Sequence, residues 1–106
     1  MLSGLHVELD KDLVLPKQYT LYQNYPNPFN PVTNISFDLP EQVYVSLIVY
    51  DIMGREILRI SDGRLNGGHY KFSWSGKHNS GRVASTGIYF YRFTAGDFQQ
   101  TRKMLI

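Results

Sequence analysis

The chain has 106 residues, of which 42% are hydrophobic and 19% are charged. This balance is typical of one folded domain and excludes a disordered tail, and the short length excludes most self-contained enzymes. Cysteine is absent, so disulfides and cysteine zinc sites are excluded. The net charge of +2 is too small to indicate nucleic-acid binding, and no apolar stretch reaches the ~20 residues of a transmembrane segment.

The first residues of the chain differ from the rest. Residues 1–15 mix acidic and apolar side chains, which predicts a linker or the fringe of a preceding domain. Met1–Asp12 has neither the basic start nor the long apolar stretch of a secretory signal peptide. We therefore expect one domain over residues 16–106.

A proline-rich stretch at residues 24–31, called the proline segment below, precedes the first predicted strand. Its motif residues are Pro26, Asn27, Pro28, Phe29 and Pro31. Proline fixes φ and has no amide hydrogen, so this stretch cannot form a helix interior or a central strand. The residue before each proline favours extended geometry, and asparagine side chains bond their own backbone. We expect a rigid loop that Tyr25 and Phe29 anchor on the core.

Beyond the proline segment, apolar and polar residues alternate with period two, which predicts half-buried strands. The predicted strands cover residues 33–39, 43–50, 55–60, 68–74, 82–85, 87–94 and 98–105. Turns rich in glycine separate these strands, and no stretch has convincing helical spacing. About seven short strands with regular turns predict an all-β fold, an immunoglobulin-like antiparallel β-sandwich.

The fifteen aromatic residues divide between the two faces of the predicted strands. One face carries Tyr70, Phe72 and Trp74 on one strand, and Tyr89, Tyr91 and Phe93 on another. Aromatic rings at period two favour an inter-sheet core over a sugar-stacking platform. The rings on the opposite faces, which are Tyr44, Tyr50 and Phe90, are better candidates for an exposed patch.

The last predicted strand is the strongest candidate for binding a partner. Alternation places Arg102 and Lys103 on opposite faces, so at least one of them is expected in solvent. The segment closes the sheet, and an edge strand also offers backbone groups and charge to a partner strand. The candidate recognition residues are Arg102, Lys103, Met104, Leu105 and Ile106.

Catalytic, metal and cofactor sites are not indicated by the sequence. The three histidines, His6, His69 and His78, show no ligand spacing and are interpreted as surface residues. No Gly-x-Ser-x-Gly elbow and no phosphate-binding loop occurs. We therefore expect no enzyme activity and no cofactor.

The order of motifs along residues 16–106 resembles a known family. The proline segment is followed by Thr33, Ile35 and Phe37, then by Val49-Tyr50-Asp51 and by Gly68-His69-Tyr70 with Trp74. The series ends in Ser85-Thr86-Gly87-Ile88-Tyr89, Ala95-Gly96 and Thr101-Arg102-Lys103-Met104. In this order the motifs resemble the type A C-terminal sorting domain of the type IX secretion system, also called the Por secretion system. That family is related to the immunoglobulin-like domain of flagellar hook-capping proteins.

The resemblance implies a secretion signal rather than a catalyst. Such a domain would target a covalently attached N-terminal cargo to the type IX translocon at the outer membrane of Bacteroidetes-type bacteria. The C-terminal signal peptidase of the secretion system would usually remove the domain after export. The protein would thus be periplasmic in transit to the cell surface or the medium. The alternative is a non-catalytic structural or carbohydrate-binding immunoglobulin-like module attached to an extracellular protein.

Overall fold

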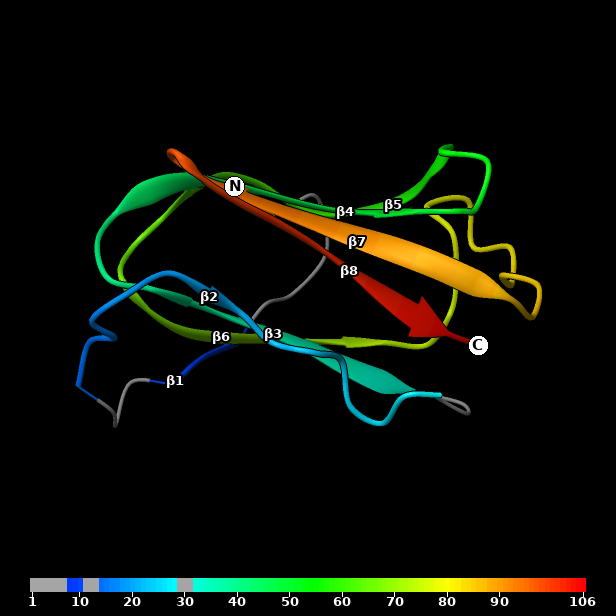
Figure 1. The fold of residues 1–106 in the computed structure, drawn as a ribbon, viewed down its shortest axis with the longest axis horizontal. Helices are drawn as coiled ribbons and strands as arrows, with labels where there is room; N and C mark the ends of the chain where they lie inside the picture. The colour runs from blue at the N-terminus through cyan, green and yellow to red at the C-terminus, as the bar shows by residue number, and fades with distance from the viewer. Residues whose placement is uncertain (1–7, 11–13, 29–31) are drawn as a thin grey trace.

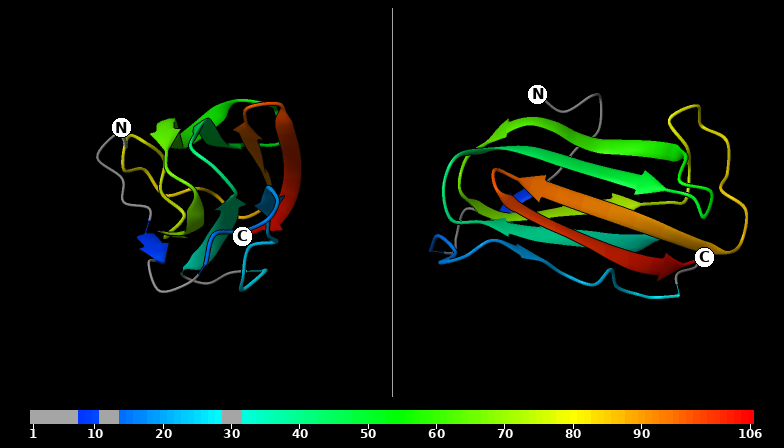
Figure 2. Two further views of the ribbon diagram at one scale, coloured as in Figure 1. Left: turned by 90° about the vertical axis from the view of Figure 1, so that its left-hand side faces the viewer. Right: turned by 45° about the horizontal axis from the view of Figure 1, so that its top comes forward.

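The computed structural model describes residues 8–10, 14–28 and 32–106, which form two antiparallel sheets (Figure 1). One sheet has the strand order β1-β6-β3-β2, and the other has the order β5-β4-β7-β8. The strands are β1 (Glu8–Asp10), β2 (Thr20–Leu21), β3 (Thr33–Leu39), β4 (Val43–Tyr50), β5 (Glu56–Leu65), β6 (Gly68–Trp74), β7 (Ile88–Ala95) and β8 (Phe98–Leu105). Figure 2 shows the sheets as two layers that face each other. The predicted fold class, an all-β immunoglobulin-like sandwich, is confirmed.

Four predicted strands, β3, β4, β6 and β8, have the observed bounds, and β7 is shifted by one residue. The strand predicted over 55–60 is longer, because β5 continues to Leu65 in pairing with β4. A register shift opposite Leu47 and Ile48 interrupts its alternation, so Ile60 and Ser61 are both buried. The strand predicted over 82–85 is wrong. This stretch makes only an isolated bridge between Lys77 and Val83, because the loop bonds to itself.

Two short strands were not predicted. β1 pairs with β6, and β2 pairs with β3, so that each lies at one edge of the first sheet. Strands of three and two residues are too short to produce a recognisable alternation. β1 lies within residues 1–15, so part of that stretch pairs with the sandwich. The division into a linker at 1–15 and a domain at 16–106 stays a prediction.

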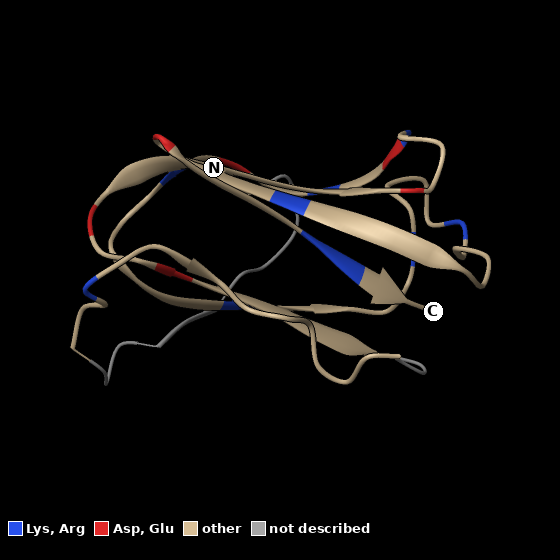
Figure 3. Ribbon diagram, viewed as in Figure 1, with Lys and Arg blue, Asp and Glu red and all other residues tan. Residues whose placement is uncertain are grey.

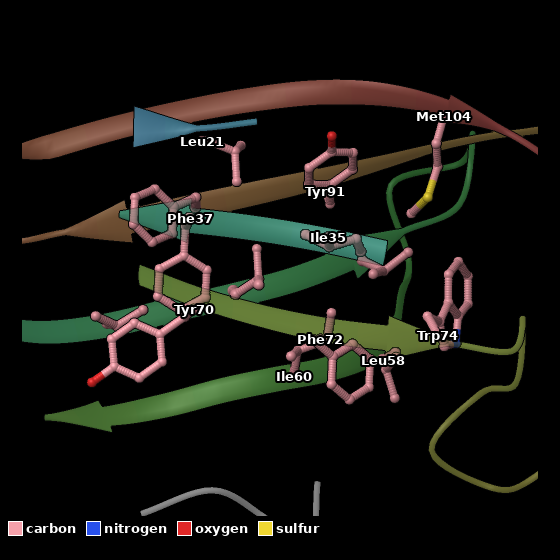
Figure 4. Packing of buried hydrophobic residues seen from close by; sticks show 14 of the residues in the cluster. Leu21, Ile35, Phe37, Leu58, Ile60, Tyr70, Phe72, Trp74, Tyr91 and Met104 are labelled. Carbon is pink, nitrogen blue, oxygen red and sulfur yellow. The ribbon is translucent and has the colours of Figure 1, made fainter. Parts of the chain in front are cut away.

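Among the described residues, the core between the sheets combines seven aromatic side chains with aliphatic side chains from both sheets (Figure 4). All six rings predicted for the core are at most 7% exposed. The Phe37 ring lies 5.2 Å from the Tyr70 ring and 4.9 Å from the Phe93 ring, measured between centroids, so it joins the two sheets. Such contacts add to the burial energy of the rings, which accounts for a stable core without disulfides.

The rings on the opposite faces are less exposed than the alternation suggests. Tyr44 is 50% exposed, as predicted, but Tyr50 and Phe90 are half-buried. The Arg92 guanidinium lies 5.0 Å from the centroid of the Tyr50 ring and donates a 2.7 Å hydrogen bond to its hydroxyl. The predicted exposed patch is therefore partly covered by Arg92.

Candidate functional site

β8, the candidate recognition strand, lies at the edge of its sheet and, among the described strands, pairs with β7 alone (Figure 1). Its side chains alternate between the core and the solvent, so Arg102 and Lys103 lie on opposite faces, as predicted. Met104 is fully buried, whereas Lys103 and Leu105 are exposed. The five candidate residues therefore divide into an inward set and an outward set.

The inward set, Arg102, Met104 and Ile106, holds the end of the chain to the sandwich. The Arg102 Nε donates a 2.7 Å hydrogen bond to the Leu21 carbonyl, which ties β8 to the other sheet. Ile106 packs on the core and exchanges two backbone hydrogen bonds with Gly87, at 3.0 and 3.2 Å. These side chains are occupied in the fold, so they are poorly placed to contact a partner.

The outward set, Lys103 and Leu105, lies beside the outward residues of β7. Phe90 stands directly opposite Lys103, and Ile88 stands opposite Leu105. Leu105 is 37% exposed, and Lys103 makes no ion pair with any described residue. We call these four residues the terminal patch. It combines a free ammonium group with apolar surface, which is suitable for contact with another protein.

The free edge of β8 is capped by residues around the proline segment. Gln23 Nε2 donates a 2.8 Å hydrogen bond to the Lys103 carbonyl, and the Leu105 amide donates a 2.9 Å hydrogen bond to Asn27 Oδ1. Figure 2 shows the segment after β2 running beside β8. The proline segment and the C-terminal strand, which are the first and last motifs of the sequence, thus lie side by side in one site. Sequence reasoning missed Gln23, which carries no local signal for such a contact.

The described part of the proline segment is held by buried polar groups rather than by Tyr25. Tyr25 is 78% exposed, so the prediction that its ring anchors the segment on the core is wrong. Instead the Thr33 hydroxyl donates to the Pro26 carbonyl at 2.8 Å, and the buried Asn24 Nδ2 donates to Thr33 Oγ1 at 2.9 Å. The peptide bonds before Pro26 and Pro28 are cis. Phe29 and Pro31 lie outside the described residues.

The Tyr91 hydroxyl links β7 to the residue after β2 and to the start of the proline segment. It donates to the Tyr22 carbonyl at 2.8 Å and accepts a 2.8 Å hydrogen bond from the Asn24 amide. Burial raises the pKa of this hydroxyl to about 12. Sequence reasoning placed Tyr91 in the core but gave no role to its hydroxyl.

Gly87 and Tyr89, from the motif Ser85-Thr86-Gly87-Ile88-Tyr89, lie around the start of β7. Gly87 has a φ of +147°, a conformation that side chains disfavour, and its peptide groups bind Ile106. The Tyr89 hydroxyl donates to the Ser85 carbonyl at 2.6 Å, and its ring packs edge-on against Trp74. Both residues therefore support the end of β8.

The histidines take no part in a metal site within the described residues. His69 Nδ1 lies 2.7 Å from Asp38 Oδ1, and Asp38 also accepts a hydrogen bond from the Tyr22 hydroxyl. His78 lies in the loop before Arg82, and His6 lies outside the described residues. No group of three metal-ligating side chains occurs in the described part of the chain. Among these residues, no helix is long and apolar enough to cross a membrane.

Comparisons with known proteins agree with this architecture. The sequence model of the FlgD Ig-like domain family matches residues 25–97. Dimeric latent PorU from Porphyromonas gingivalis is similar in fold, with a TM-score of 0.65 and 18% identity over 87% of this chain and 9% of PorU. FlgD from P. aeruginosa is also similar, with a TM-score of 0.53 and 28% identity over 70% of this chain and 58% of FlgD. None of the curated proteins matches.

The chain is thus short relative to both solved proteins, and the similarity to PorU is one of fold alone. The family match, in contrast, runs from Tyr25 in the proline segment to Asp97 before β8, which is more than half of the chain. The chain therefore belongs to the FlgD Ig-like domain family.

Proposed function

We propose that this chain is a C-terminal secretion signal domain that targets an attached cargo protein to the type IX translocon. The ordered motif series over residues 16–106 supports this function, and the sandwich fold is compatible with it. The observation that carries the proposal is the terminal patch. Its outward residues Lys103 and Leu105 have no role in the core, yet the backbone beneath them is fixed by Gln23 and Asn27.

The chemistry of such an address is binding alone. Every cargo differs, so the feature that the translocon recognises must lie in the shared domain. Lys103 offers a charge that steers and orients the partner, and Leu105, Ile88 and Phe90 offer apolar area that favours burial. A fixed backbone lowers the entropy lost on binding. The C-terminal signal peptidase would then remove the domain, and the cargo would reach the cell surface or the medium.

The proposal is tested by fusing the whole chain to the C-terminus of a reporter that carries its own export signal to the periplasm. The fusion is expressed in a bacterium with the type IX machinery and in the same strain lacking the translocon. We expect the reporter at the surface or in the medium of the first strain only. Reporter that stays in the periplasm of both strains would contradict the proposal.

A carbohydrate-binding module is a second candidate, favoured by a shallow hollow on the outer face of the second sheet. The hollow measures about 320 Å³, and its lining includes Tyr50, Phe90, Arg92 and Thr101. Arginine and aromatic rings suit a sugar, but Arg92 already covers the Tyr50 ring on which a sugar would stack. Binding to a glycan array that is lost in Phe90→Ala would favour this candidate. A purely structural module would show neither glycan binding nor export.

A further inference from the structure

A second surface lies at the end of the sandwich where the chain terminates. A pocket of about 340 Å³, called the pole pocket below, opens between the β4–β5 turn, residues 78–87 and the first residues of β7. The β4–β5 turn and residues 78–87 lie at the right-hand end of the view in Figure 1. The pocket lining contains none of residues 102–106, and Ile88 is the residue that the pocket shares with the terminal patch.

The rim of the pole pocket concentrates exposed apolar side chains. Ile52 is 67% exposed, Met53 is 76% exposed and Val83 is 70% exposed, and Ile88 adds a fourth apolar side chain at 36%. Scattered exposed apolar residues are ordinary, but a group on three neighbouring segments around one pocket indicates a binding surface. An isolated anion in the pocket would leave these side chains in water, so the ligand must itself carry apolar groups.

The charges in the lining are mainly positive. The Arg55 and Arg82 side chains line the pocket, and Arg82 makes no ion pair with the part of the chain that the structure describes. Asp51 is the acidic residue of the lining, and it is already engaged by Arg55 Nε at 2.8 Å. Figure 3 shows both basic and acidic residues at this end of the molecule. The charge of Arg82 is therefore available to pair with a negative group on the ligand.

The segments around the pole pocket are fixed before any ligand arrives. Asp51 Oδ1 accepts the amides of Met53 and Arg55, both at 2.9 Å, and closes the β4–β5 turn. The His78 amide donates to the Arg82 carbonyl at 2.8 Å, and the Ala84 amide donates to the Gly76 carbonyl at 2.7 Å. Because both segments are bonded, little conformational entropy remains to be lost on binding.

We infer that the pole pocket binds an acidic peptide segment of another protein, in which carboxylates alternate with apolar side chains. The apolar side chains would cover Ile52, Met53 and Val83, and a carboxylate would pair with the Arg82 guanidinium. The pocket opens between the β4–β5 turn and residues 78–87, so an extended peptide in it has protein on both sides. Alternation then lets one face of the peptide meet Ile52 and Met53 while the other meets Arg82. This inference goes beyond the proposed function and does not depend on it.

The test is a titration of the ¹⁵N-labelled chain followed by NMR, with an acetylated hexapeptide that alternates glutamate and leucine. We expect amide shifts at Ile52–Gly54 and at Arg82–Ile88, with residues 99–101 unchanged. One control peptide has lysine in place of glutamate, and a second has serine in place of leucine. Both should bind at least about tenfold more weakly, because each lacks one of the two interactions.

Variants of exposed residues complete the test. Arg82→Glu should weaken binding of the glutamate–leucine peptide about tenfold or more, and Val83→Ser should weaken it severalfold. Lys17→Glu, which reverses an exposed charge in the loop before β2, is the matched control and should leave affinity unchanged. Each variant should keep the amide shifts of the wild type away from its substituted residue, which shows that the variants fold alike. The inference is overturned if the peptide causes no shifts at the pocket, or if Arg82→Glu binds as well as Lys17→Glu.

Discussion

Single hydroxyl and amide groups hold the candidate site together, and the Tyr91 hydroxyl is one that makes two hydrogen bonds. Removing it in Tyr91→Phe leaves the Tyr22 carbonyl and the Asn24 amide without their partner. We expect the free energy of unfolding to fall by about 1–3 kcal/mol, the usual cost of buried polar groups left unpaired. Urea denaturation measures this change, and an unaltered midpoint would contradict it.

The raised pKa of Tyr91 also predicts a pH dependence of stability. Below its ordinary pKa of 10.0 this residue is protonated in the folded and unfolded states, and it contributes no pH dependence. Between pH 10 and about 12 the unfolded state loses the proton while the folded state keeps it, so the free energy of unfolding falls as pH rises. Urea denaturation across this range should show a shallower fall for Tyr91→Phe than for the wild type. Parallel pH curves for the two proteins would refute this prediction.

Truncating neighbouring side chains of β8 should change the free energy of unfolding by very different amounts. Lys103→Ala should change the free energy of unfolding by less than about 0.5 kcal/mol, because the side chain is exposed. Met104→Ala should lower it by about 2–5 kcal/mol, because the side chain is fully buried. Thermal or urea denaturation compares the two variants. Equal losses in both would mean that the outward and inward sets are wrongly assigned.

At the scale of the element, the edge of β8 is protected by side chains rather than by another strand. Asn27→Ala removes the acceptor for the Leu105 amide, so exchange of that amide with solvent should quicken severalfold. Asn27→Asp, which keeps an acceptor oxygen, is the matched control and should preserve slow exchange. Hydrogen exchange followed by NMR reports this amide directly. Identical exchange in Asn27→Ala and the wild type would show that the cap contributes nothing.

Elements with uninterrupted alternation could be predicted from the sequence to within a residue, as β3 and β6 show. Strands that form only because a neighbouring strand pairs with them could not be predicted. Ser61–Leu65 of β5 is strand because β4 offers bonding groups beside it, and the register shift there conceals the period of two. The stretch 82–85 has strand-like composition but lacks a neighbouring strand. The alternation of apolar and polar residues indicates which face of a strand each residue prefers. Hydrogen bonding to a neighbouring strand determines whether the strand forms.

At the scale of the whole molecule, the candidate site joins residues that are distant in the sequence. Alternation alone predicts that at least one of Arg102 and Lys103 faces solvent, and in the structure Lys103 is the exposed one. The hydrogen bond from Gln23 to the Lys103 carbonyl spans 80 positions, and no local pattern encodes it. The fold brings β2 and β8 together at neighbouring edges of the two sheets, and the Arg102 bond to Leu21 fixes their approach. The site is therefore a product of topology as much as of motif.

The central claim is that the translocon recognises the outward face of β8, and that the outward side chains Lys103 and Leu105 are not needed for folding. The most direct measurement is export of a reporter fused to the chain carrying Lys103→Glu and Leu105→Ser together, with Lys17→Glu as the matched control. Melting of the isolated variants establishes that all are folded. We expect the double variant to melt close to the wild type and to keep its reporter in the periplasm, while the control is exported. Normal export of the folded double variant would contradict the claim.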